Sequence, residues 1–293
     1  MRRSLSLLCL FLAPFAAAQT TSLRVLFLGN SLTAGNDVPA IVAALAQLQG
    51  VSFRYDTRAP GGWNLEDHWN AGDGSLLRQT DYDIVILQQG PSTLPESQIN
   101  LREWTVVWSA YARQQGALPA LFMVWPTRGQ ANGFTLVSDS YRNAAAAGQA
   151  ALFPAGEAWN LALATQSSLA LYSDDLHATP AGSLLAAMVI GRGLFALDPA
   201  RVPTRLPTAS GDIVVTAATL DLFRSIVGSY QPTVLDFTVT NATTPAPATP
   251  LPNPTGNVGG PGGSSGGGGS TPPWLALALT LALVARSLRF AMR

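Results

Sequence analysis

The sequence predicts an α/β domain built on one parallel sheet with helices on both faces. Apolar runs of strand length alternate along the chain with longer segments of helical spacing, and this alternation is typical of parallel sheets. The run Ile84–Gln88 shows no regular alternation of apolar and polar residues, as expected of a strand buried on both faces. The body that carries these elements, residues 19–241, is long enough for one domain with a substantial core.

Four further segments are predicted as strands. Leu23–Leu28 is an apolar run rich in strand formers, and Val51–Thr57 alternates between apolar and polar residues. Leu118–Trp125 is an apolar run that is ended by Pro126. Ala151–Phe153 is a short fifth strand.

Helices are predicted between and after these strands. Asn36 or Asp37 caps the first helix, and Asn64 caps a short one, since these side chains accept hydrogen bonds from free amides at a helix start. A β-like segment, Val234–Thr240, closes the body. The longer predicted helices are Pro39–Leu48, Gln98–Gln115, Val137–Ala150, Glu157–Ala164, Pro180–Phe195 and Thr216–Tyr230.

The amino end, residues 1–18, reads as a secretory signal peptide. Two arginines precede a short apolar core, and three alanines then offer a cleavage site, so the mature chain is expected to begin at Gln19. The chain's one cysteine, Cys9, lies inside this segment. The exported protein is therefore expected to contain neither disulfides nor thiolate chemistry.

The carboxyl end reads as a linker followed by an anchor. Residues 242–273 are rich in Thr and Pro and then in Gly and Ser, typical of a flexible tether, and residues 274–293 are an apolar run with an arginine tail. The run is short for a spanning helix, which needs roughly 17–25 residues. The order of these features resembles the Gly-Gly C-terminal sorting signals of Gram-negative bacteria, which a rhomboid-type protease cleaves. We expect a periplasmic or cell-surface protein, either membrane-anchored through this segment or released after processing.

Charge and motifs argue against several classes of function. The body carries seventeen acidic residues against twelve arginines and no lysine, a net charge of −5, without a basic stripe for nucleic acid. No HExxH motif or comparable cluster suggests a metal, and no glycine-rich phosphate loop follows the first strand. We expect no metal and no cofactor.

A serine loop, Gly29–Thr33, follows the first predicted strand. Ser31 therefore falls at the carboxyl edge of the sheet, where open α/β folds place their sites. Gly29 permits a sharp turn, and the first free amides of the loop can face an anion. Taken alone, the stretch is equally compatible with a turn whose serine bonds only the backbone.

Two histidines occur in the chain, His68 and His177. Asp174 and His177, three apart on one loop, can place a carboxylate against one ring nitrogen and leave the other for Ser31. The alternative is that Asp174 or Asp175 caps the helix that follows, and both roles can hold together. His68 lies near a predicted helix start, where packing or a surface hydrogen bond is the usual role, so His177 is the preferred base.

Two blocks of the sequence resemble the SGNH/GDSL hydrolases. The segment Gly29–Thr33 is similar to their first block, Gly-Asp-Ser-x-Thr, with Asn30 in place of the acid. The segment Asp174–Gly182 is similar to their last block, Asp-x-x-His-(Pro/Ala)-x-x-x-Gly. The resemblance spans about residues 23–195. The first block lies near the start of the domain and the last block near its end, as in the family.

The two middle blocks resemble the family less closely. The glycine of the second block is matched by Gly62, or by Gly61, ahead of Trp63. The third block, Gly-x-Asn-Asp, is where the chain departs, since Gly90 is followed by Pro91, Ser92 and Thr93. Ser92 therefore stands where the family has its asparagine.

The resemblance implies a fold and a set of roles. The fold would be a flavodoxin-like, three-layer α/β/α sandwich with a five-stranded parallel sheet. Ser31 would be the nucleophile, His177 the base and Asp174 its orienting group, and the amides of Ser31 and Gly62 would bind the oxyanion. The candidates for the third oxyanion donor, in place of the asparagine, are Ser92, Gln89 and Gln88.

Two functions from different classes follow. The first is an exported serine esterase acting on acyl or acetyl esters, with carbohydrate acetyl esters suggested by Trp63 and Trp69, which flank the predicted site and can stack on sugar rings. The alternative, which we favour slightly, is that these tryptophans are core or groove-wall residues. The second is a surface-displayed binding module that kept the fold and lost efficient catalysis, which the departure at Ser92 favours.

Overall fold

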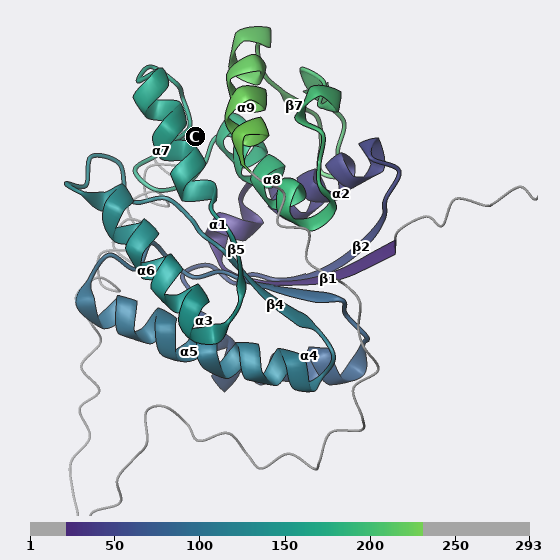
Figure 1. The fold of residues 1–293 in the computed structure, drawn as a ribbon, viewed down its shortest axis with the longest axis vertical. Coiled ribbons are helices and arrows are strands. Elements are labelled where there is room, and N and C mark those ends of the chain that lie inside the picture. The colour runs from purple at the N-terminus through teal and green to yellow at the C-terminus, as the bar shows by residue number, and fades with distance from the viewer. Residues whose placement is uncertain (1–21, 231–293) are drawn as a thin grey trace, which may run out of the picture. The chain divides into compact units, whose positions relative to one another are not determined.

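A central sheet of five parallel strands organises the computed structural model, which describes residues 22–230 (Figure 1). The strand order is β2-β1-β3-β4-β5. All four neighbouring pairs are parallel, which confirms the predicted sheet. The strands are β1 Ser22–Leu28, β2 Ser52–Arg58, β3 Ile84–Leu87, β4 Leu118–Phe122 and β5 Ala151–Phe153.

Helices cover both faces of the sheet, which confirms the predicted three-layer arrangement. In Figure 1, α5 and α6 run along one side of the sheet, and α2 and α8 lie on the other. The helices are α1 Ser31–Ala34, α2 Val38–Leu48, α3 Leu65–Asn70, α4 Gly74–Gln79, α5 Pro95–Gln114, α6 Gly133–Gly148, α7 Ala155–Thr165, α8 Pro180–Phe195 and α9 Ala217–Ser229, with short 3-10 turns η1 Gly35–Asp37 and η2 Pro199–Arg201.

Side-chain caps fix where several helices start. Of the two residues proposed to cap α2, Asp37 does so, accepting from the amide of Ala40. Asn64 caps α3 in a reciprocal box with Asp67, each side chain accepting from the other's amide. Thr179 caps α8, which has a proline in its first turn.

The core lies between the sheet and its two helical layers. All four residues of β3 are buried, and burying one such aliphatic side chain contributes roughly 1.5–3 kcal/mol. Beyond β4, the indole of Trp125 stacks on that of Trp159 from α7, with ring centroids 3.7 Å apart. Gly182 of α8 packs so closely on Trp159 that a methyl group would overlap the ring. This packing seats the start of α8, and with it the loop that carries His177.

The structure differs from the sequence prediction in the end of one strand and in several short elements. The strand predicted to end at Trp125 ends at Phe122, because its neighbour β5 has only three residues and pairing stops with it. Helix α4 and a two-stranded antiparallel pair, β6 Arg205–Leu206 with β7 Ile213–Val214, were not predicted. Elements this short give too little periodicity to detect in a sequence.

Several predictions concern residues outside the described range. The signal peptide, the segment Val234–Thr240, the linker and the C-terminal apolar run all lie there. Within residues 22–230, none of the helices combines the length and apolar character that crossing a bilayer requires.

Candidate active site

The serine loop leaves the carboxyl end of β1 and turns directly into α1. Asn30 is the capping residue, and its Oδ1 accepts a hydrogen bond from the amide of Leu32 at 3.0 Å. Its Nδ2 donates to the carbonyl of Trp63 at 2.9 Å. Asn30 therefore both starts the helix and joins the serine loop to the loop before α3.

Gln88, directly after β3, holds the serine loop through hydrogen bonds to Asn30 and Thr33. Its Oε1 accepts from the amide of Asn30 at 2.9 Å and from the hydroxyl of Thr33 at 2.7 Å. Its Nε2 donates to Oδ1 of Asn30 and to the carbonyl of Gln89. Gln88 is fully buried and both of its donor hydrogens are engaged, so it is a support of the serine loop and has no donor left for an oxyanion.

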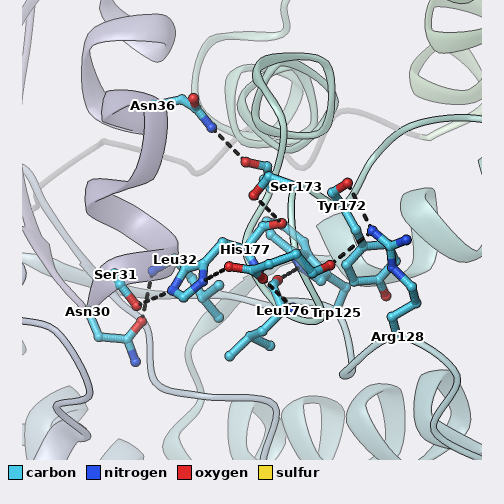
Figure 2. A network of polar contacts seen from close by, with 12 residues as sticks. Asn30, Ser31, Leu32, Asn36, Trp125, Arg128, Tyr172, Ser173, Leu176 and His177 are labelled. Carbon is cyan, nitrogen blue, oxygen red and sulfur yellow. Dashed lines mark hydrogen bonds and ion pairs between the residues drawn. The ribbon is translucent and has the colours of Figure 1, made fainter. Parts of the chain in front are cut away.

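Three side chains from two distant parts of the sequence meet at this edge of the sheet (Figure 2). Nε2 of His177 lies 2.9 Å from Oγ of Ser31, and Nδ1 of His177 lies 2.8 Å from Oδ2 of Asp174. The carboxylate can only accept, so it fixes the imidazole proton on Nδ1 and leaves Nε2 as an acceptor for the serine hydroxyl. The structure thus brings together the three residues that the sequence proposed as a unit.

The carboxylate of Asp174 is held in its ionised form. Burial acts to raise its pKa, but hydrogen bonds from the amides of Leu176 and His177 and from the His177 ring outweigh it and lower the pKa to about 2. The two amide bonds, at 2.7 and 2.6 Å, also close the loop as a cap would. Asp174 therefore has the contacts of an orienting group, whereas the prediction that Asp174 or Asp175 caps the following helix is wrong, because Thr179 caps α8.

Two side chains of the segment between β4 and α6, Trp125 and Arg128, contact the histidine loop (Figure 2). Arg128 donates from Nη2 to the carbonyls of Tyr172 and Asp174, at 3.0 and 2.9 Å. Trp125 donates from its indole to the carbonyl of Leu176 at 2.8 Å. These bonds hold the main chain on both sides of Asp174.

Besides the Ser31–His177 bond, Asn36 also joins the turn after α1 to the histidine loop. Asn36, with φ of 51° in the left-handed region, donates from Nδ2 to the carbonyl of Ala178 at 3.0 Å and to Oγ of Ser183 at 2.9 Å. Asparagine tolerates this backbone conformation better than most residues. Asn36, which the sequence offered as a helix cap, instead ties the turn after α1 to the residue after His177.

Two of the proposed oxyanion donors are main-chain amides. Among residues 22–230, the amides of Ser31 and Gly62 have no acceptor in the protein. Gly62 has φ of 79°, which favours glycine, and Ser31 begins α1, whose first amides are unsatisfied by geometry. Both amides are thus available to an anionic oxygen.

The side chains proposed as the third donor are engaged with each other. Nε2 of Gln89 donates to Oγ of Ser92 at 3.0 Å, and this hydroxyl donates to the carbonyl of Gly90 at 3.1 Å. Oε1 of Gln89 accepts from the amide of Leu65. Both side chains are buried, and Ser92 has φ of 54°. Only the hydroxyl of Ser92 can redirect its proton by a simple rotation.

The two tryptophans proposed to bind substrate have different surroundings. Trp63 follows Gly62, is half-buried, and has the guanidinium of Arg58 over its ring at 5.4 Å. Trp69 packs its ring against Trp104, Trp108 and Tyr111 of α5, with centroids 5.3–6.0 Å apart. The contacts of Trp69 are those of a packing residue between α3 and α5.

His68 is fully buried, which excludes the surface hydrogen bond considered from its sequence position. Its ring bonds the carbonyl of Gly29 and the carboxylate of Asp73, a residue that the sequence analysis did not single out. Asp73 lies five residues after His68, just beyond a short helix. This spacing matches no motif, so the sequence did not indicate that the two side chains meet.

Two surface hollows occur away from the Ser31 hydroxyl. One, of about 420 Å³, is lined partly by Arg128, Gln130 and Tyr172, next to the support of the histidine loop. The other, of about 520 Å³, lies between α2, β2 and the segment after β6. Within the described part of the chain, no three histidine or carboxylate side chains gather as a metal site requires.

Solved structures similar to this chain include SGNH/GDSL hydrolases and esterases. A candidate SGNH hydrolase from Slackia heliotrinireducens shares 28% identity over 59% of this chain and 98% of its own, with a TM-score of 0.49. A candidate GDSL-like lipase from Parabacteroides merdae shares 14% over 58% and 94%, also at 0.49. An acetylxylan esterase from Geobacillus stearothermophilus shares 15% over 59% and 92%, at 0.45. No family model matches the chain, and no curated protein matches it in sequence.

Proposed function

We propose that this chain is an exported serine ester hydrolase of the SGNH/GDSL type that acts on acyl or acetyl esters. The observation that carries the proposal is the continuous series of hydrogen bonds from the hydroxyl of Ser31 through His177 to Asp174. A serine hydroxyl is a poor nucleophile until a base takes its proton, and the base must be oriented by a third group. The three residues have the donors and acceptors in the order that this chemistry needs.

The reaction would proceed in two halves. Oγ of Ser31 attacks the ester carbonyl carbon while Nε2 of His177 takes the hydroxyl proton, giving a tetrahedral intermediate. His177 returns this proton to the leaving alcohol oxygen as the ester bond breaks, which leaves an acyl group on Ser31. Water then attacks the acyl-enzyme with the same proton transfers and releases the acid. Asp174 stays ionised throughout and stabilises the imidazolium.

The charge of each intermediate would be held by main-chain amides. The carbonyl oxygen becomes an oxyanion, and donors about 2.7–3.1 Å from it stabilise it more than they stabilise the planar ester. The amides of Ser31 and Gly62, neither of which has an acceptor among the described residues, are two donors in this proposal. The hydroxyl of Ser92 is the third donor in this proposal, after it turns away from Gly90.

For the substrate, we favour esters whose alcohol or acyl part can lie against an aromatic ring. Trp63 is half-buried and adjoins Gly62, so its ring is the aromatic surface closest in sequence to the proposed oxyanion site. A sugar ring can pack on such a face, which makes carbohydrate acetyl esters one substrate class to test. Trp69, packed against α5, has no part in this proposal.

A second function, a binding module with weak or no catalysis, is supported by one observation. Ser92 stands where the resemblance places an asparagine, and its hydroxyl is already bonded to Gly90 and Gln89. The loss of one oxyanion donor can lower turnover by about 10²–10³. The two functions therefore differ in rate rather than in fold.

Labelling with a fluorophosphonate probe, followed by mapping of the modified residue, tests the proposal. We expect the probe to modify Ser31, and we expect Ser31→Ala and His177→Ala each to abolish hydrolysis of a short-chain aryl ester, since members of such a unit act together. Both variants should keep the wild-type melting temperature within a few degrees. Modification of another residue, or an active Ser31→Ala variant, would overturn the proposal.

Export and processing are a separate part of the proposal, supported by the sequence of the two ends. The amino end has the features of a signal peptide, and the Gly/Ser tract precedes a short apolar run with arginines. Intact-mass measurement of the native protein decides both. We expect an amino terminus at Gln19 and a carboxyl terminus within the Gly/Ser tract, whereas one at Arg293 would refute processing.

A further inference from the structure

A second histidine–carboxylate pair lies directly behind the serine loop. Nδ1 of His68 lies 2.7 Å from Oδ2 of Asp73, and Nε2 lies 2.8 Å from the carbonyl oxygen of Gly29. His68 is fully buried, and the side chain of Asp73 is 11% exposed. The amide of Asp73 also donates to the carbonyl of His68 at 3.1 Å, so these two residues are joined through both their main chains and their side chains.

The neighbours of the His68 ring fix how many protons it carries. The carbonyl of Gly29 has no proton to give, so Nε2 must carry one to make its bond. An ionised Asp73 carboxylate also only accepts, so Nδ1 must carry a second. A ring with a proton on each nitrogen is an imidazolium. A neutral ring would require the proton to sit on the carboxyl of Asp73 instead.

The surroundings of Asp73 favour the ionised carboxylate. Its second oxygen, Oδ1, lies 3.3 Å from Nε of Arg58, so the group faces a guanidinium as well as the imidazole. His68 and Arg58 are the cationic partners of Asp73 within residues 22–230. A buried charge is retained only where it is paired and hydrogen-bonded. The ring of Trp63, whose centroid is 5.1 Å from that of His68, adds no titratable group.

The bond from His68 ends on the peptide group that leads into the serine loop. The amide of Gly29 donates to the carbonyl of Arg58 at 3.0 Å, and its carbonyl accepts from His68. The next amide, of Asn30, donates to Gln88 at 2.9 Å. The peptide plane between Gly29 and Asn30 is thus bonded at both of its polar atoms, which fixes the direction in which the chain enters Ser31.

We propose that His68 is a buried imidazolium, held by Asp73, that positions the serine loop by fixing the carbonyl of Gly29. It is a positioning residue, since it acts through the main chain and not on the substrate. The charge assignment stands on the two acceptors alone, whereas the effect on reaction rate rests on the proposed function. Displacing a reacting group by about 1 Å can cost about a hundredfold in rate.

Nitrogen-15 NMR of the full-length protein tests the charge of the ring. The chain has only two histidines, so the spectrum of His177→Ala assigns the ring of His68 without ambiguity. At neutral pH we expect both ring nitrogens of His68 to show a directly bonded proton that exchanges slowly with water, because the residue is buried. A ring nitrogen without a proton would overturn the imidazolium.

The rate of fluorophosphonate labelling of Ser31 tests the positioning. His68→Gln keeps a neutral amide donor and loses the charge, and Asp73→Asn removes the partner that holds it. For each we expect labelling and kcat on an aryl ester to fall about ten- to a hundredfold, with KM within about twofold of wild type. The matched control is Tyr82→Phe, which also loses one hydrogen bond to an aspartate, Asp56. It should label at the wild-type rate.

The outcomes separate this proposal from the proposed function. If wild-type Ser31 does not react with the probe, the esterase assignment fails, while the NMR result on His68 still stands. If the wild type reacts and His68→Gln and Asp73→Asn react equally fast, the positioning role is overturned. Should His68→Gln fail to fold, Asp73→Asn with its intact imidazole supplies the rate measurement.

Discussion

The guanidinium of Arg128 donates a hydrogen bond to the main-chain carbonyl of Asp174, at a distance of 2.9 Å. Arg128 is exposed, yet it forms no ion pair within the described residues. It bonds instead to two carbonyls of the loop that carries the proposed base, and its guanidinium lies 5.1 Å from the centre of the Tyr172 ring. A surface arginine is in this way part of the support of the site.

Replacing Arg128 by alanine should therefore lower turnover without unfolding the protein. The loop keeps the amide bonds of Asp174 but loses its two outer restraints, so we expect kcat to fall about tenfold with little change in KM. Steady-state kinetics on an aryl ester measure this. Arg142→Ala, which removes an exposed arginine paired with Glu157, is the control and should keep wild-type kinetics. Equal effects of the two substitutions would contradict the role given to Arg128.

The lowered pKa of Asp174 predicts how stability depends on acid. The folded value is about 2, against an ordinary value of 3.8, so between these values the folded state binds fewer protons than the unfolded state. The stabilising contribution is complete above about pH 4 and is lost as the pH falls toward 2. The side chain is 57% exposed, so water screens it and the contribution is about 1 kcal/mol or less.

Urea unfolding of the wild type and of Asp174→Asn measures this contribution. The difference in unfolding free energy between the two should be constant from pH 5 to 7 and should shrink from pH 4 toward pH 2. A difference between wild type and Asp174→Asn that grows as the pH falls would have the wrong sign and would refute the assignment.

Substitutions at Ser92 test the proposed third oxyanion donor. Ser92 has φ of 54°, a conformation that asparagine tolerates well, so Ser92→Asn introduces an amide donor without backbone strain. We expect kcat to rise or stay unchanged in Ser92→Asn and to fall in Ser92→Ala. Melting temperatures control for packing in this buried position. If Ser92→Ala leaves kcat unchanged while Gln89→Ala lowers it strongly, the third donor is Gln89.

Some elements of this protein can be predicted to the residue from its sequence. Strand β5 and helix α8 have the predicted residues, because apolar runs and a Thr-Pro start are local signals. The neighbourhood of Ser31, Asp174 and His177 was also predictable. Ser31 follows a strand at the carboxyl edge of the sheet, and the spacing of Asp174 and His177 lets a carboxylate orient a base toward a hydroxyl. The structure adds the atomic contacts: Nδ1 of His177 faces Asp174, and Nε2 faces the hydroxyl of Ser31.

The supports of the site could not be predicted in this way. Gln88 ends a strand and resembles any polar residue at a sheet edge, and nothing in its sequence context shows that both ends of its amide are bonded. Asp73 and Arg128 act through main-chain carbonyls or through one buried ring, and such contacts leave no spacing in the sequence. They depend on how loops fold over one another, which local propensity does not encode.

The bond between Ser31 and His177 joins residues 146 positions apart, and α8, which follows His177, packs on α2, which follows Ser31. A chain made from its amino end therefore presents the serine long before its partner exists. Until α8 has docked, the hydroxyl has no base and is chemically ordinary. Under the proposed function, completion of the fold is therefore the step that activates Ser31.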